Sequence, residues 1–133
     1  MLRNFFSKKP LPLTGAPAVR RLKSYSAQSG YVYQYFYEGQ RPFGSGGESG
    51  IEFVFTVSAD RKTFDPVSVL VTEAALRAWE QTHAHALSST ERYAVSKMAL
   101  FQAFDERSGP NQMRDNVRVR NADVEAIIET LGL

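Results

Sequence analysis

The regular alternation of side chains in the first half of the chain limits its fold more than any other feature. Residues 31 to 38 carry the strongest β signal, because aromatic and β-branched side chains alternate there with a period of two and fit a pleated sheet. Similar patterns predict a second strand at residues 51 to 57 and a third at residues 67 to 71. We therefore expect an antiparallel three-stranded sheet, with a short fourth strand at residues 24 to 27 as an option at its edge.

Helical spacing replaces this alternation after the third strand. A first helix is predicted over residues 73 to 86, with Thr72 as its N-cap. Its inward stripe is expected at Leu76, Trp79 and His83. A second helix is predicted over residues 88 to 107, because Ser88 and Glu91 have the spacing of a capping box.

A third helix is predicted at the C-terminal end, with Asn121 as its expected N-cap. Apolar residues with helical spacing predict its buried face at Val124, Ile127, Ile128 and Leu131. Residues 115 to 120, just before this helix, are expected to be irregular. Because three strands precede three helices, we expect an α+β fold rather than a doubly wound sheet.

Charge is distributed unevenly along the chain. The first acidic residue is Glu38, and six basic residues precede it. With 16 basic and 14 acidic residues in total, the part before Glu38 has a net charge of +6 and the remainder −4. Three prolines within residues 10 to 17 prevent a continuous helix there. We therefore divide the chain into an extended basic, proline-rich arm at residues 1 to 24 and a single α+β domain at residues 25 to 133.

We expect the arm to bind a larger partner protein. Phe5 and Phe6 would enter an apolar groove of that partner, while basic side chains make electrostatic contacts with it. The residues assigned to partner binding are Phe5, Phe6, Lys8, Lys9, Arg20, Arg21, Lys23, Arg41 and Phe43. Two alternatives for the arm are a solvated tail and a mitochondrial-type presequence, which its acid-free, arginine-containing composition also fits.

The sequence contains no constellation typical of a catalytic or metal site. The absence of cysteine excludes disulfides, thiolate nucleophiles and zinc fingers. Glu80 and His83 have the spacing of one half of a carboxylate-bridged di-metal site, but no second such pair exists. His83 and His85 would point apart on a helix, so His83 is expected at the boundary of the core. We expect no catalytic residue, no metal and no cofactor.

Residues 39 to 50 contain five glycines and resemble a phosphate-binding loop in composition only. Ser49 stands where the third glycine of the dinucleotide-binding fingerprint is required, and the segment joins two strands rather than opening a helix. We expect a flexible hairpin excursion, through which Arg41 and Phe43 contact a partner.

Together these features favour a non-catalytic accessory or structural subunit of a larger, hetero-oligomeric intracellular assembly, anchored by its basic arm. The alternative is an RNA-binding component of a ribonucleoprotein, in which the arm holds phosphates and the tyrosine-rich face of residues 31 to 37 stacks bases. No segment approaches about 18 consecutive apolar residues, so no membrane span is expected. We identify no small-molecule substrate. The expected compartment is the cytoplasm, with the mitochondrion or another organelle interior as the alternative.

Overall fold

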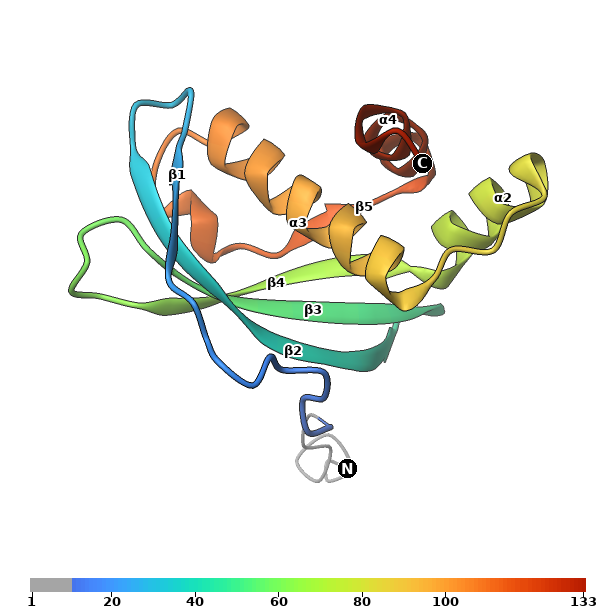
Figure 1. Ribbon diagram of the computed structural model, residues 1–133, viewed down its shortest axis with the longest axis horizontal. Helices are drawn as coiled ribbons and strands as arrows, with labels where there is room; N and C mark the ends of the chain where they lie inside the picture. Colours follow the sequence, from blue (N-terminus) through green and yellow to red (C-terminus); the bar gives the residue numbers. More distant parts are fainter. Residues whose placement is uncertain (1–10) are drawn as a thin grey trace.

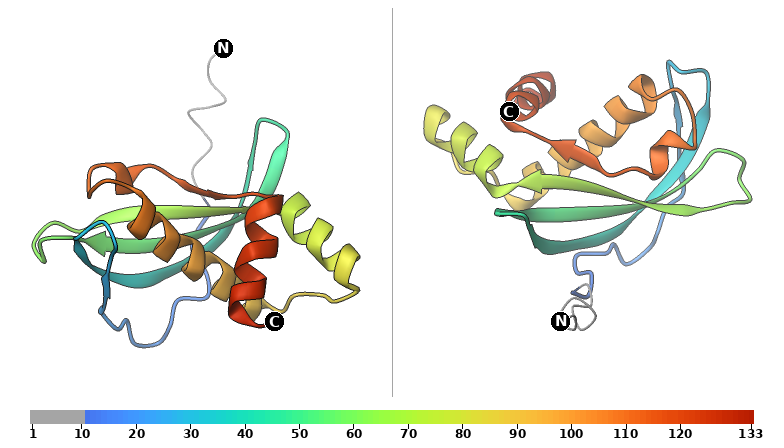
Figure 2. Two further views of the ribbon diagram at one scale, coloured as in Figure 1. Left: turned by 90° about the horizontal axis from the view of Figure 1, so that it is seen from above. Right: turned by 180° about the vertical axis from the view of Figure 1, so that it is seen from behind.

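The computed structural model describes residues 11–133, in which one curled sheet carries three α-helices on a single face (Figure 1). The elements are, in chain order, β1 (Lys23–Ser26), β2 (Val32–Ser45), β3 (Glu48–Ser58), β4 (Asp65–Thr72), α2 (Glu73–His83), α3 (Ser89–Glu106), the short 3-10 helix η1 (Gln112–Arg114), β5 (Val117–Val119) and α4 (Asn121–Leu131). Both side views show the three α-helices on one side of the sheet and the start of the described chain on the other (Figures 1 and 2). The sheet therefore has one covered face and one face that the helices leave open.

Five strands form the sheet in the described part of the chain, in the order β1-β2-β3-β4-β5. Neighbouring strands are antiparallel except β4 and β5, which are parallel. The α+β class is therefore confirmed. The prediction of a three-stranded antiparallel sheet is wrong, because the sheet has five strands and one of its strand pairs is parallel. The optional edge strand is present as β1, in which Lys23 to Ser26 pair with β2.

The strand that the sequence analysis missed is β5, which lies in the segment expected to be irregular. It contains only three residues, too few for a period-two pattern to be recognised. Val117 and Val119 are buried and pair with Val69 and Val71 of β4. A parallel neighbour needs a long crossover connection, and the segment containing α2 and α3 supplies it.

The glycine-rich segment forms the end of the β2–β3 hairpin, so the hairpin expected from the sequence is confirmed and its strands are longer than predicted. β2 and β3 remain paired up to the residues that flank Gly46 and Gly47, which alone form the turn. Both turn residues have positive φ, 59° and 82°, as a type I′ hairpin requires. Gly50 allows β4 to pack closely against β3, because a Cβ at this position would lie 2.1 Å from the carbonyl oxygen of Val71. The glycines therefore serve the turn and the packing of this hairpin.

Helix α3 lies across the covered face and buries the tyrosines of β2. The Tyr33 ring stacks on Phe104 with their centroids 4.3 Å apart, and Tyr25 of β1 stacks on Phe101 at 4.4 Å. Tyr33 and Tyr35 are 0% and 5% exposed. The tyrosine row is therefore a packed aromatic layer beneath a helix.

The first two helices begin where their capping residues predict. The Thr72 hydroxyl accepts a hydrogen bond from the backbone N–H of Ala75, and the capping box of Ser88 is present. Helix α2 ends earlier than expected, at His83, because Ala84 adopts a left-handed conformation with φ 48° and ψ 44°. The shorter helix leaves a loop that returns the chain to the start of α3.

Helix α4 has the predicted buried face, with Val124, Ile127 and Ile128 in the core. Its N-cap is Arg120 rather than Asn121, which is already helical. The backbone N–H of Arg120 donates to the Asp123 carboxylate at 2.9 Å, as in the backbone half of a capping box.

Candidate binding site

The N-terminal segment, residues 11 to 22, follows the edge of β2 (Figure 1). Thr14 and Gln40 exchange two backbone hydrogen bonds, each 2.8 Å long. Strand pairing resumes at Lys23, the first residue of β1. Between Thr14 and Lys23, no backbone hydrogen bond joins the described segment to β2. The segment is therefore attached to β2 at both ends and separated from it in the middle.

A proline in the segment and a bulge in β2 account for this separation. Pro17 has no backbone N–H to donate to a neighbouring strand. In addition, β2 has a β-bulge between Tyr37 and Gly39, and a bulge bends its strand and interrupts pairing. Gly39 allows the segment to pass closely, because a Cβ there would lie 2.7 Å from the carbonyl oxygen of Thr14.

A pocket of about 560 Å³ occupies the space between this segment, β2 and the start of α3. Its aromatic lining consists of Tyr35, Phe36, Tyr37 and Tyr93. Pro17 and Val19 add apolar surface from the segment, while Ser89 and Thr90 add hydroxyl groups from the first turn of α3. The pocket thus combines mostly apolar walls with a few polar groups, which is the usual make-up of a ligand site.

Positive charge gathers around this pocket. Arg21 and Lys23 line it, and within residues 11–133 neither of them forms an ion pair with a carboxylate. Lys97 of α3 lies beside it, with its amine 5.9 Å from the centroid of the Tyr35 ring. Burial, followed by the neighbouring Lys23 ammonium, lowers the pKa of Lys97.

The carboxylates next to the pocket residues in the chain have other partners. Glu38 forms an ion pair with Arg20 at 3.0 Å and accepts a hydrogen bond from the Thr56 hydroxyl. Glu91 accepts a hydrogen bond from the backbone N–H of Ser88 at 2.9 Å, and this bond lowers the pKa of its carboxyl group. Neither acid is therefore free to neutralise the cations of the pocket.

Two tyrosines pack against each other where β2 meets α3. The ring centroids of Tyr37 and Tyr93 lie 4.7 Å apart. Burial, followed by the proximity of Tyr93, raises the pKa of Tyr37 to about 12, and burial also raises the pKa of Tyr93. Both hydroxyl groups therefore stay neutral at ordinary pH and add no negative charge to the pocket.

The residues assigned to partner binding are distributed over several places. Phe5, Phe6, Lys8 and Lys9 lie outside the described residues. Arg20, Arg21 and Lys23 lie at the pocket or next to it. Arg41 and Phe43 belong to β2 rather than to a loop. Sequence analysis missed Tyr93 and Lys97, for which the only signal was a lysine within an otherwise apolar stretch of a predicted helix.

Arg41 has partners within its own domain. Its guanidinium makes two hydrogen bonds to the Glu52 carboxylate, of 3.0 and 3.3 Å, and donates a third to the Leu11 carbonyl oxygen at 3.3 Å. Burial disfavours the ionised form of Glu52, but the hydrogen bonds from Arg41 and Ser68 outweigh it and lower the pKa of this carboxyl. Arg41 therefore ties the N-terminal segment to the sheet, and any partner has to compete with these bonds.

The tyrosine-rich face is not accessible for base stacking, because α3 covers Tyr33 and Tyr35. Basic side chains before α4 are also engaged, since Arg114 and Arg118 form ion pairs with carboxylates of β4 and β3. Within the described residues, the unpaired cations of the pocket are therefore the groups best placed to meet an anion.

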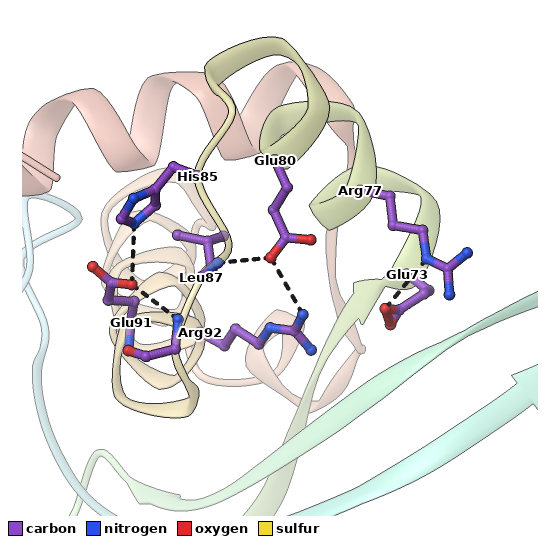
Figure 3. A network of polar contacts seen from close by, with 8 residues as sticks. Glu73, Arg77, Glu80, His85, Leu87, Glu91 and Arg92 are labelled. Carbon is purple, nitrogen blue, oxygen red and sulfur yellow. Dashed lines mark hydrogen bonds and ion pairs between the residues drawn. The ribbon is translucent and has the colours of Figure 1, made fainter.

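A second polar cluster joins α2 to α3 (Figure 3). Glu80 accepts a hydrogen bond from the backbone N–H of Leu87 at 2.7 Å and lies 3.4 Å from the Arg92 guanidinium. Beside it, the His85 imidazole lies 3.5 Å from the Glu91 carboxylate. Glu80 therefore fixes the loop between the two helices. No group of three potential metal ligands occurs among residues 11–133.

His83 is exposed, with 37% of its side chain open to solvent, so the prediction that it belongs to the inward stripe of the first helix is wrong. Its ring stacks on Trp79 with centroids 4.4 Å apart, and its Nδ1 is 3.0 Å from the Trp79 carbonyl oxygen. Its Nε2 is 3.4 Å from the Glu125 carboxylate of α4. Both ring nitrogens therefore have partners on the helices around them.

No protein-family model, curated protein or solved structure matches this chain. The described residues contain no helix that is both long and apolar enough to cross a bilayer. The functional argument therefore rests on the geometry of the N-terminal segment and its pocket.

Proposed function

We propose that this protein is a non-catalytic accessory subunit of a larger protein assembly and that it docks through its N-terminal segment. The observation that supports this most strongly is the exposure of apolar side chains beside unpaired cations. Leu11, Val19 and Leu22 are 54%, 64% and 52% exposed. Exposed apolar side chains within one short segment favour a protein contact, and Arg21 and Lys23 of the same stretch favour a partner with an acidic surface.

The contacts that hold this segment to its own domain are few and weak. Beyond the Thr14 and Gln40 pair and the bond from Arg41, the segment makes an ion pair between Arg20 and Glu38. The Arg20 side chain is 57% exposed, and such exposed ion pairs stabilise a fold by only about 0 to 1 kcal/mol. These polar contacts do not bury the side chains of Leu11, Val19 and Leu22. Because these side chains are little more than half exposed, a partner that covers them would gain about 1 to 2 kcal/mol for each one.

The proposal is tested with the full-length tagged chain, purified with its partners from cells that express it and analysed by mass spectrometry. A triple variant, L11S/V19S/L22S, removes the apolar contacts and keeps every charge. A matched control, Phe64→Ser, removes an exposed apolar side chain that lies away from the segment. We expect a defined set of co-purifying proteins that resists nuclease, disappears with the triple variant and persists with the control.

Reconstitution then separates direct from indirect binding. The most abundant co-purifying protein is expressed alone and titrated with the parent chain and both variants, with the fold of each checked by circular dichroism. Equal affinity of the parent and the triple variant would contradict docking through the segment. The same conclusion would follow if no protein bound to the purified chain.

In the RNA-binding alternative, the same cations would contact RNA, but the tyrosine-rich face is covered by α3 and cannot stack bases. Arg21 and Lys23 also suit a phosphate backbone, for which affinity falls steeply with salt. Co-purification that is abolished by nuclease and insensitive to the triple variant would favour this alternative over a protein partner.

A further inference from the structure

We propose that the pocket between the N-terminal segment, β2 and α3 binds a small organic anion with a flat apolar body, such as an aromatic carboxylate or an aromatic phosphate monoester. This inference does not depend on the docking role proposed above. It rests on a shaped cavity, its aromatic walls and a cluster of cations without acidic partners.

The size and walls of the pocket fit a small molecule. Its volume of about 560 Å³ lies within the range of known ligand sites. Tyr35, Phe36 and Tyr93 provide its aromatic lining, and Val19 adds apolar surface from the N-terminal segment. A flat apolar group packs well against such walls, because aromatic rings prefer stacked or edge-to-face neighbours.

The charges specify an anionic end for this ligand. Lys23 is the cross-strand partner of Tyr35, and the Lys97 amine lies 5.9 Å from the ring of the same tyrosine. Both lysines therefore lie next to Tyr35, and Arg21 lines the same pocket as Lys23. Gathering like charges without a counter-ion is unfavourable, and a bound anion relieves the repulsion.

Among residues 11–133, no carboxylate forms an ion pair with Arg21, Lys23 or Lys97. Glu38 is paired with Arg20, and Glu91 is held by the backbone of Ser88. These acids flank the pocket residues in the chain but belong to other contacts. A carboxylate or phosphate from a ligand would instead meet Arg21 and Lys23 directly, as guanidinium and ammonium groups commonly bind both kinds of anion.

The pocket exists because the sheet edge is interrupted at this point. Pro17 and the bulge at Gly39 keep the segment from pairing with β2 between Thr14 and Lys23. Continuous pairing would fill this space with backbone. The interruption therefore exposes aromatic side chains and cations to the same cavity.

The test uses isothermal titration calorimetry on the full-length chain with four probes. 1-Naphthyl phosphate and 1-naphthoate carry the same ring with different anions, 1-naphthamide carries the ring without charge, and inorganic phosphate carries charge without a ring. We expect at least one naphthyl anion to bind, and we expect the neutral amide and inorganic phosphate to bind at least about tenfold more weakly. The stronger of the two naphthyl anions identifies the preferred acidic group.

Three variants locate the binding site. Arg21→Gln and Lys23→Gln each remove one charge from the pocket wall, and Lys97→Met removes the third while keeping a long apolar side chain. Each change should weaken binding of the naphthyl anion by about five- to tenfold. The cause is the loss of a hydrogen bond to the anion or of the electrostatic attraction from the removed positive charge. Lys62→Gln, in the turn between β3 and β4, is the matched control and should leave the affinity unchanged.

Several outcomes would overturn the inference. Absence of binding by both naphthyl anions would refute it. Equal binding of the neutral amide would show apolar association only, and equal binding of inorganic phosphate would show general ion binding. Unchanged affinity in all three pocket variants would place the site elsewhere. Because these titrations need no partner protein, their failure would leave the docking proposal untouched.

Discussion

Individual tyrosines carry much of the packing between the sheet and its helices. Tyr33 stacks on Phe104, and Tyr37 packs on Tyr93. These rings are large enough to fill the space between a curved strand and a helix, and the Tyr33 hydroxyl is buried there without a hydrogen-bond partner among the described residues. At the scale of single residues, Tyr33 therefore belongs to the core alone, whereas Tyr37 and Tyr93 also line the pocket.

The raised pKa of Tyr37 predicts a loss of stability in alkali. Its pKa rises to about 12 because burial disfavours the phenolate, whereas an exposed tyrosine titrates near about 10. The folded state therefore prefers the neutral hydroxyl. This contribution is complete below pH about 10 and is lost as the pH rises through about 12.

The measurement is the free energy of unfolding in urea as a function of pH, for the parent chain and for Tyr37→Phe. Phenylalanine cannot ionise, so the variant should lose less stability than the parent above pH about 10. Identical alkaline profiles would show that Tyr37 titrates alike in the folded and unfolded states.

Two aromatic residues of the helices should differ in their effect on stability. Trp79 is 6% exposed and Phe101 is only partly buried. We expect Trp79→Ala to lower the free energy of unfolding by about 3 to 5 kcal/mol and Phe101→Ala to lower it by less, about 2 kcal/mol. Equilibrium urea denaturation measures both values. A near-neutral Trp79→Ala would mean that the Trp79 ring is not part of the core.

At the scale of elements, the hairpin of β2 and β3 depends on glycine at specific positions. A Cβ at Gly50 would lie 2.1 Å from the Val71 carbonyl oxygen, whereas a Cβ at Gly44 would meet its nearest neighbour at 3.9 Å. We expect Gly50→Ala to destabilise the protein by more than about 2 kcal/mol and Gly44→Ala to change stability by less than about 0.5 kcal/mol. Thermal unfolding of the two variants side by side provides the comparison, and similar midpoints would contradict the close approach of β4.

Long periodic segments were predictable from the sequence, and short or glycine-rich ones were not. Residues 51 to 57 and the buried face of α4 follow simple periods, and Thr72 and Ser88 mark helix starts. β5 has only three residues, and its position depends on β4 having a free edge rather than on its own pattern. The glycines of β2 and β3 indicated a hairpin by composition, but sequence alone does not reveal how far its strands pair or the close packing at Gly50.

At the scale of the whole molecule, the candidate site combines parts that sequence analysis found with parts that it did not. The excess of positive charge before Glu38 pointed to Arg21 and Lys23. Tyr93 and Lys97 lie far along the chain and reach the same place only when α3 packs over β1 and β2. Tertiary packing therefore defines the pocket, and its ligand chemistry could not be anticipated from local patterns.

The domain should fold without its N-terminal segment. Removing residues 1 to 22 leaves β1 intact and deletes the bonds from Thr14 and Arg20. We expect cooperative unfolding to persist, with the free energy of unfolding lowered by about 1 to 3 kcal/mol. Circular dichroism during urea unfolding measures both properties. A loss of the cooperative transition would show that the segment belongs to the folding unit, contrary to the division of the chain into arm and domain.

The parallel pairing of β4 with β5 sets an order of events during synthesis on the ribosome. β4 ends at Thr72, but its outer partner is completed only at Val119. Until the ribosome has added those intervening residues, the apolar edge of β4 has no strand beside it, and such an edge can pair with other chains. We therefore expect a nascent chain that stalls before β5 to aggregate more readily than the finished chain.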